Sequence, residues 1–260
     1  MSDVLIYPLQ NSKEYKDVIN CINSNKGSLL INGLLSVQKP HITYSIFNEL
    51  SRSMVFVASS DLEAKKAYED LSFYMKDKVE YLGHQDIHFY HLDAKDRNEE
   101  AKKLRVLLRL AKGEKLVLVT SVESILRKYI PKEVLLNNTF TYKVGDTLNL
   151  EELSDKLVSL GYERVSKIEG FGQFSIRGGI VDIFSLEYTN PIRMELFDDE
   201  IDSIRTFDVF SQKSIDKIKK FSITPSREFI YPEKVNNAIE KLKKETSKHT
   251  NEDVFKNIQD

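Results

Sequence analysis

The sequence predicts an α/β domain with a parallel sheet, followed by a smaller α+β domain. Over the first 125 residues, short apolar runs alternate with stretches that show helical periodicity. These apolar runs are continuous, as in strands that are covered on both faces of a parallel sheet. Beyond residue 160 the pattern changes to short segments in which apolar and polar residues alternate, typical of antiparallel strands.

The first domain begins with an apolar run at 28–34, which predicts a strand. Residues 41–50 follow with Ile42, Ile46 and Leu50 at four-residue steps. Because that spacing places the three side chains on one face, it predicts an amphipathic helix.

The rest of this domain continues the alternation. The run at 54–58 predicts a buried strand, and the Ser-Ser-Asp that follows predicts a helix cap. After an irregular stretch, a helix near 99–112 is expected to end at Gly113, and 116–121 predicts another buried strand. The apolar stripe of that helix consists of Leu104, Leu107, Leu108 and Ala111.

The second domain opens with a well-specified helix over 149–162. Asn149 is its predicted cap, Glu152 stands three residues on as in a capping box, and Gly161 fits just beyond its end. An acidic turn at 198–200 indicates a hairpin. The predicted strands are 164–168, 172–177, 180–184, 193–197 and 201–207.

Composition limits the classes of function. The 260 residues are 41% hydrophobic and 30% charged, with a formal net charge of −2, so no overall basic field attracts nucleic acid. Cys21 is the single cysteine, which excludes an internal disulfide. No signal peptide or run long enough for a bilayer is seen. We therefore expect a soluble cytoplasmic protein that does not associate with membranes.

A phosphate-binding loop would be expected between the strand at 28–34 and the next helix. The working pattern is a glycine, four residues, then Gly-Lys-Ser/Thr. Gly33 and Lys39 fit, but Gln38 replaces the second glycine and Pro40 replaces the hydroxyl residue. Because proline offers neither an amide nor a hydroxyl, the pattern favours an ordinary loop over a weakened nucleotide site.

Other chemistry is weakly indicated. Three histidines, His84, His88 and His91, lie near one another, but their aromatic neighbours favour a packed connection over a metal site. No nucleophile motif or carboxylate pair stands out. The sequence therefore predicts no catalytic residue, no metal and no cofactor.

Alternation along two strands predicts a polar surface on the second domain. In 172–177, Phe174 and Ile176 should face the core while the residues between them face outward. The side chains expected on the outer face are Ser175, Arg177, Arg193 and Glu195. Arginines beside a carboxylate suit a charge-complementary protein interface, although surface salt bridges alone would give the same pattern.

The turn "GG" next to Arg177 supports that interpretation. Gly178 and Gly179 predict a bulge or tight bend that directs Arg177, and Asp182 is expected to satisfy backbone amides near the bend. The glycines are thus assigned to shaping a docking surface.

Several motifs in one order carry a family resemblance. "GYERV", "GQFSIRGGIVDIF", "PIRMELFDDEIDSIRTFD" and "SQKSI" resemble the amino-terminal module of the bacterial transcription-repair coupling factors (Mfd). That module is itself similar to the front part of the excision-repair protein UvrB. The resemblance covers most of the chain, and 161–215 is its specific part.

The resemblance implies three regions. Residues 1–124 would form a degenerate helicase-like (RecA-like) α/β domain that has lost its nucleotide site. Residues 125–211 would form an inserted α+β domain that binds UvrA. Residues 212–260 would return to complete or flank the first domain.

The resemblance also implies a function, a non-catalytic module that recruits UvrA to stalled RNA polymerase. The contacts would map onto Arg164, Arg177, Arg193 and Glu195, with Phe174 and Ser175 in the same strand. UvrB has an additional arginine at the position of Ser175. ATP, RNA polymerase and double-stranded DNA would be bound by further domains of the full-length family members.

Two alternative functions remain at this stage. A UvrB-like, ATP-dependent repair helicase subunit would need a working phosphate loop and a long aromatic hairpin, and the sequence matches neither. A stand-alone DNA-binding domain would need a basic surface, which the near-neutral charge does not favour.

Overall fold

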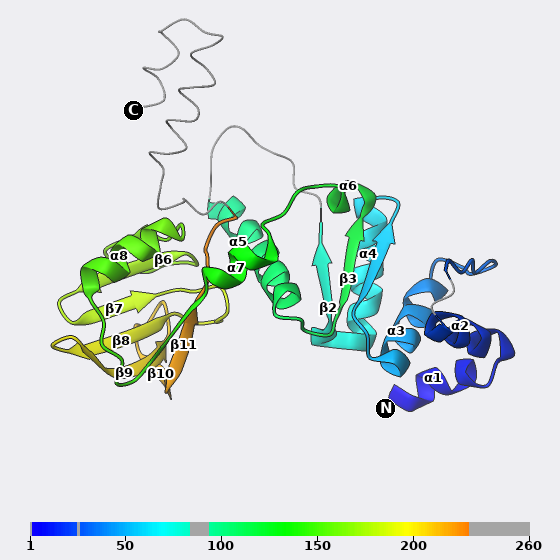
Figure 1. Ribbon diagram of the computed structural model, residues 1–260, viewed down its shortest axis with the longest axis horizontal. Helices are drawn as coiled ribbons and strands as arrows, with labels where there is room; N and C mark the ends of the chain where they lie inside the picture. Colours follow the sequence, from blue (N-terminus) through cyan, green and yellow to red (C-terminus); the bar gives the residue numbers. More distant parts are fainter. Residues whose placement is uncertain (1, 25–26, 84–93, 229–260) are drawn as a thin grey trace, which may run out of the picture. The chain divides into compact units, whose positions relative to one another are not determined.

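The computed structural model describes residues 2–24, 27–83 and 94–228 (Figure 1). The chain forms two compact units. Among the described residues, the first comprises 2–24, 27–83 and 106–132, and the second comprises 94–105 and 133–228. One long helix, α5 (Ala94–Ala111), contributes residues to both units.

The first unit is an α/β layer structure. Its helices and strands are α1 (Ser2–Gln10), α2 (Lys13–Ser24), α3 (Gln38–Leu50), β1 (Met54–Ala58), α4 (Asp61–Met75), the 3-10 turn η1 (Lys76–Lys78), β2 (Val79–Leu82), β3 (Val117–Ser121) and α6 (Val122–Ile125). The three strands are parallel, in the order β1-β3-β2.

Helices cover both faces of this parallel sheet, as the continuous apolar strands predict. Val117 and Val119 pack into a cluster with residues of α4, while Leu116 and Leu118 pack with residues of α5. Ser60 caps α4 by accepting a hydrogen bond from the backbone N–H of Glu63, which confirms the predicted cap.

The predicted strand at 28–34 is wrong. These residues form no helix or strand, and Leu30 is 80% exposed. An apolar run becomes a strand only where a neighbouring strand pairs with its backbone, and the described sheet ends at β1. The expected full burial of 54–58 is wrong for the same reason, because Val55 and Val57 are exposed on this edge strand.

The second unit is built on a six-stranded sheet. Its elements after α7 (Lys132–Asn137) are β4 (Phe140–Lys143), α8 (Leu150–Ser159), β5 (Glu163–Arg164), β6 (Gln173–Arg177), β7 (Ile180–Ile183), β8 (Ile192–Phe197), β9 (Glu200–Phe207), β10 (Ser214–Ile218) and β11 (Lys220–Ile223). The large sheet has the order β10-β9-β8-β7-β6-β5, and β11 pairs with β4 in a separate ladder. Only the β5–β6 pair of the large sheet is parallel.

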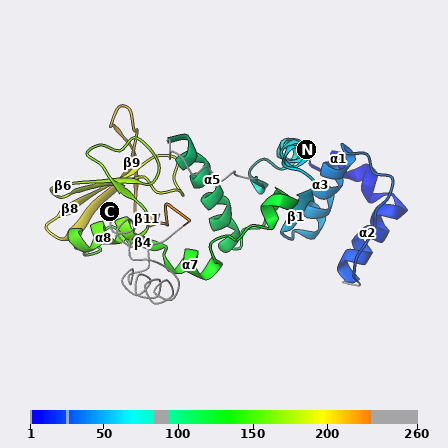
Figure 2. The same ribbon diagram turned by 90° about the horizontal axis from the view of Figure 1, so that it is seen from above.

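The core of this unit lies on one face of the large sheet. Leucines of α8 and apolar residues of β11 pack against Phe174, Val181 and Met194 of the sheet. Figure 2 shows α8, β4 and β11 on the same side of the large sheet. The opposite face carries the polar side chains described below.

The predicted helix cap, the glycine after the helix and the acidic turn of the second unit are confirmed. The side chain of Asn149 accepts hydrogen bonds from the N–H groups of Glu151 and Glu152, and Gly161 has φ +86° just after α8. Asp198 (φ +58°) lies in the predicted acidic hairpin turn between β8 and β9.

The second unit also extends further than expected. Strands β10 and β11 belong to it and lie beyond residue 211, where the sequence places its end. Of the predicted strand at 164–168, only Arg164 lies in a strand, β5. Residues 229–260 of the expected return segment lie outside the described residues.

Candidate protein-binding surface

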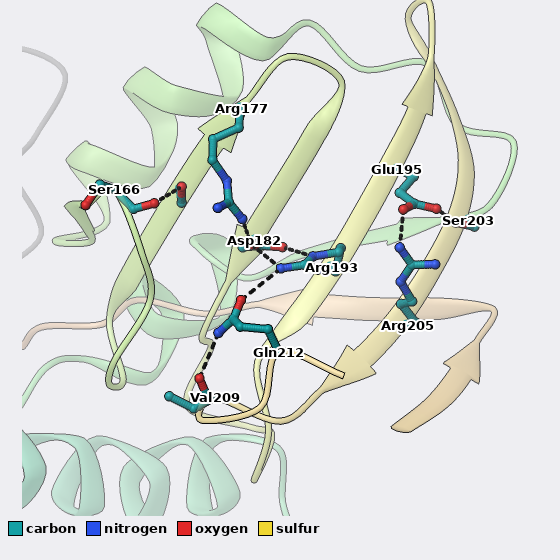
Figure 3. A network of polar contacts seen from close by, with 10 residues as sticks. Ser166, Arg177, Asp182, Arg193, Glu195, Ser203, Arg205, Val209 and Gln212 are labelled. Carbon is teal, nitrogen blue, oxygen red and sulfur yellow. Dashed lines mark hydrogen bonds and ion pairs between the residues drawn. The ribbon is translucent and has the colours of Figure 1, made fainter. Parts of the chain in front are cut away.

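The polar face of the large sheet is built from one row of side chains across neighbouring strands. Ser175 of β6 pairs in register with Asp182 of β7, Asp182 pairs with Arg193 of β8, and Arg193 pairs with Arg205 of β9. In-register residues of adjacent strands project from the same face. The row therefore gathers charged groups that are distant in sequence (Figure 3).

Asp182 is the centre of this row. Its side chain is buried, with 3% exposure, and both carboxylate oxygens accept hydrogen bonds from arginines. Arg193 contributes two of these bonds, from Nε to Oδ1 at 2.6 Å and from Nη2 to Oδ2 at 2.8 Å, and Arg177 contributes one at 2.7 Å. The expectation that Asp182 holds backbone amides is therefore wrong, because cross-strand pairing places the guanidinium of Arg193 beside it.

The guanidinium of Arg193 has two further contacts besides Asp182. Its side chain is only 14% exposed, its Nη2 donates to Oε1 of Gln212 at 3.2 Å, and its Cζ lies 4.4 Å from the ring centroid of Phe207. The hydrogen bonds that Arg193 donates to Asp182 raise the pKa of Arg193 above its usual value, against the opposing effect of burial. Arg193 is therefore a fixed positive charge within the sheet surface.

Of the two arginines that bind Asp182, Arg177 is the more accessible. Its side chain is 50% exposed, although Asp182 anchors one nitrogen of the guanidinium. The two-residue turn Gly178–Gly179 follows it directly, and Gly178 has φ +57°. A Cβ on Gly179 would lie 2.9 Å from the carbonyl oxygen of Leu196, so the close approach of two backbones requires glycine there. The predicted tight bend beside Arg177 is confirmed.

Glu195 forms a second polar group on this face. It accepts a hydrogen bond from Oγ of Ser203 at 2.9 Å and forms an ion pair with Arg205. Its side chain is one-third exposed (33%), so part of it remains accessible to solvent.

Two predicted contact residues are buried. Phe174 is a fully buried member of the core, and Ser175 is buried while its hydroxyl donates to the carbonyl oxygen of Ser166 at 3.1 Å. Neither side chain reaches the surface in this structure. The sequence pattern assigned Ser175 to the correct face but did not indicate that the chain at Ser166 covers it.

Arg164 lies apart from the other predicted contacts. It is in register with Phe174, so it belongs to the face of the sheet that α8 covers. There it lines a hollow of about 400 Å³ together with the α8 residues Glu151, Ser154 and Asp155. The structure thus brings together Arg177, Arg193 and Glu195 but not Arg164.

Gln212 was missed in the sequence, although it lies in the same network. It joins the loop after β9 to Arg193, and its amide nitrogen donates to the carbonyl oxygen of Val209 at 2.7 Å. No local pattern marks this glutamine, because its role depends on a partner 19 positions earlier in the chain.

The candidate phosphate loop lies in the first unit. Gly33 has φ +83°, and the Gln38 side chain accepts a hydrogen bond from the N–H of Leu35 at 2.9 Å. Gln38 is the first residue of α3, and Pro40 is buried in its first turn. A hollow of about 420 Å³ lies beside this turn, with Lys39, Lys66, Glu63 and Asp70 among its lining residues.

Within the ranges 2–24, 27–83 and 94–228, no group of three histidine, cysteine or acidic side chains is arranged to hold a metal ion. His84, His88 and His91 lie outside these ranges. No helix in the described part of the chain is long and apolar enough to cross a membrane.

Comparisons with known proteins agree with this architecture. Residues 140–229 match the family model of the UvrB interaction domain. The chain is 32% identical over 236 residues to a transcription-repair-coupling factor of Bacillus subtilis. The aligned region covers 90% of this chain and 20% of that protein. Proteins of the same name from Staphylococcus aureus and Staphylococcus epidermidis are 30% and 31% identical, over 90% and 89% of this chain and 20% of each relative.

The class of protein follows from these matches. The second unit, with its polar sheet face, carries a UvrB interaction domain, which is a protein-interaction module. The chain belongs to the transcription-repair-coupling factors, as the amino-terminal UvrB-homology module of that family. It spans about a fifth of the length of the relatives it matches.

Proposed function

We propose that this chain is a non-catalytic docking module that recruits UvrA to RNA polymerase stalled on damaged DNA. The observation that carries the proposal is the half-exposed side chain of Arg177, anchored by the buried Asp182 within the matched UvrB interaction domain. Contacts of the full-length family with RNA polymerase and double-stranded DNA belong to the same proposal, through regions outside this chain.

The arrangement of the arginines suits recognition of an acidic protein surface. The planar fork of an arginine binds a carboxylate in a defined geometry, and a pre-positioned side chain loses less entropy on binding. Asp182 binds one nitrogen of the Arg177 guanidinium, and half of the Arg177 side chain remains accessible to solvent. We therefore assign Arg177 to contact with the partner.

Arg193 and Glu195 have different roles in this proposal. Arg193 is a positioning residue, because it fixes Asp182 with two hydrogen bonds and is itself mostly buried. Glu195, one-third exposed and held by Ser203 and Arg205, offers a carboxylate to a basic group of the partner. Arg164 would contribute to a separate contact beside α8.

The proposal includes a first unit that is a degenerate helicase-like (RecA-like) domain without a working ATP site. The three parallel strands with helices on both faces are compatible with part of such a domain. The hollow beside the first turn of α3 is lined by two lysines, Lys39 and Lys66, and by two acidic residues, Glu63 and Asp70, so its formal charges balance and offer phosphate no net positive field. Pro40 supplies no hydroxyl for a magnesium ion. Measurement of ATP binding by the whole chain tests whether this nucleotide site works.

Titration of the whole chain against purified UvrA tests the recruitment function. We expect saturable binding that weakens by about thirtyfold in Arg177→Ala, the loss typical of an interface hot spot. Arg52→Ala is the matched control, because Arg52 is an exposed arginine of the first unit. It should leave the affinity unchanged.

Two results would contradict the proposal in different ways. If the folded, unsubstituted chain fails to bind UvrA, the recruitment function is wrong. If the chain binds UvrA but Arg177→Ala binds equally well, the function stands and the assignment of the arginine surface is wrong.

A further inference from the structure

Among the described residues of the second unit, the most exposed large apolar side chain belongs to the loop that contacts the arginine network. Phe210 is 91% exposed, in the loop Asp208–Lys213 that joins β9 to β10. We call this segment the Phe210 loop. Three residues before it, Phe207 is fully buried beneath the guanidinium of Arg193, so the two aromatic rings at this end of β9 have opposite environments.

The backbone that carries Phe210 is fixed by its own hydrogen bonds. Oδ1 of Asp208 accepts from the N–H and the hydroxyl of Ser211, at 2.8 and 2.7 Å, and these bonds lower the pKa of Asp208. The N–H of Gln212 donates to the carbonyl oxygen of Asp208 at 2.8 Å, and the N–H of Asp208 donates to that of Lys213 at 2.9 Å. Phe210 is therefore displayed from a closed turn.

The Phe210 loop is joined to the arginines through one side chain. Gln212, in a left-handed conformation (φ +59°), donates to the carbonyl oxygen of Val209 and accepts a hydrogen bond from Arg193. Arg193 in turn binds Asp182, which binds Arg177 (Figure 3). A continuous set of contacts thus connects the loop that carries Phe210 to the accessible Arg177.

An exposed phenylalanine on a fixed turn has a specific physical meaning. Exposure of the ring to water is unfavourable, and the core of the second unit leaves it outside. Its burial by a partner would release that free energy with little loss of backbone entropy, because the turn is already ordered. Aromatic anchors close to charged groups are a common composition of binding hot spots.

We propose that Phe210 is an apolar anchor for the same partner that Arg177 binds. The partner surface would offer an apolar pocket for the ring and, next to it, a carboxylate for the guanidinium. Arg177 and Arg193 carry two positive charges against the one negative charge of Asp182, and this net positive charge favours such an acidic rim. This inference rests on the proposed function and adds to it a second, apolar contact with UvrA.

Phe210→Ala in the whole chain tests the anchor by titration against UvrA at several salt concentrations. We expect a loss of about thirtyfold in affinity, the range of a buried aromatic hot spot. Phe210→Leu should recover most of the affinity, because leucine is also apolar. Phe73→Ala is the matched control, since Phe73 is 79% exposed in the first unit, and should bind as the unsubstituted chain does.

Salt separates the two contacts. Arg177→Ala should weaken the dependence of affinity on salt, because it removes a charge pair, whereas Phe210→Ala should leave that dependence unchanged. Since Phe210 is almost wholly exposed, the thermal unfolding temperature should not fall in its variants.

The outcomes distinguish this inference from the proposed function. Binding by the unsubstituted chain and by Phe210→Ala with equal affinity overturns the anchor and leaves the recruitment function intact. No binding by the unsubstituted chain overturns both. Equal losses in Phe210→Ala and Phe73→Ala also overturn the anchor, because the effect would then be general to exposed aromatic residues.

Discussion

At the scale of single residues, two arginines on one carboxylate have different consequences. Arg193 is 14% exposed and binds Asp182 through two nitrogens, whereas Arg177 is 50% exposed and binds it through one. A buried pair becomes costly when one partner is removed, because the other charge is left without compensation. An exposed ion pair contributes little to stability. We therefore assign Arg193 and Asp182 to stability and Arg177 to binding.

Asp182→Ala tests this division. Removal of the carboxylate leaves the Arg193 guanidinium without its main partner, and we expect the free energy of unfolding to fall by about 3 kcal/mol. Arg177→Ala should lower it by less than about 1 kcal/mol, because that pair is half exposed. Urea denaturation of the whole chain measures both changes.

Asp202→Ala is the control for Asp182→Ala, because Asp202 is an exposed acidic residue of β9. It should leave the free energy of unfolding within about 0.5 kcal/mol of the original value. If the free energy of unfolding of Asp182→Ala falls by an equally small amount, Asp182 does not stabilise the polar sheet face.

At the scale of elements, the hairpin of β6 and β7 determines where Arg177 lies. Its turn consists of Gly178 and Gly179, and the carbonyl oxygen of Gly179 accepts a hydrogen bond from the N–H of Leu196 in β8, at 2.8 Å. The turn therefore packs against the backbone of a third strand. Any side chain that separates these backbones would also move Arg177.

Gly179→Ala should destabilise the chain by about 1 kcal/mol or more, because its Cβ would lie 2.9 Å from the Leu196 carbonyl oxygen. Its affinity for UvrA should fall as well. Gly170→Ala is the matched control, because a Cβ there meets no atom within 4 Å. Thermal unfolding and UvrA titration of both variants measure the effects. If the two variants behave alike, the close packing of the turn is unimportant.

At the scale of the whole molecule, the two units have separate cores. The clusters around α4 and α5 belong to the first unit, and the cluster under α8 belongs to the second. The net charge of −2 supplies no general attraction to DNA. Specific binding must therefore come from local surfaces, and the polar sheet face lies within the residues that the family model matches.

Nucleotide binding is the property that separates a docking module from a motor. We expect ATP with magnesium to bind the whole chain more weakly than about 1 mM, if at all, because Gln38 and Pro40 replace two residues of the phosphate loop. Isothermal titration with a working phosphate-loop ATPase as positive control measures this. Micromolar affinity or hydrolysis would favour the UvrB-like helicase subunit instead.

The sequence by itself determined the local features of this protein. Asn149 as a cap, the left-handed Gly161, the turn at Gly178 and Gly179, and the inward direction of Phe174 follow from interactions within a few residues. Such preferences are encoded by short segments and survive in most surroundings. The motif order likewise indicated the family that the comparisons show.

Only the tertiary structure decided which of these residues meet. Strand order places Asp182 between Arg177 and Arg193, buries Ser175 beneath the chain at Ser166, and separates Arg164 from the other arginines. It also left the apolar run at 28–34 without a neighbouring strand. The physical reason is that alternation fixes the face on which a side chain lies, whereas its neighbours depend on pairing between strands that are distant in sequence.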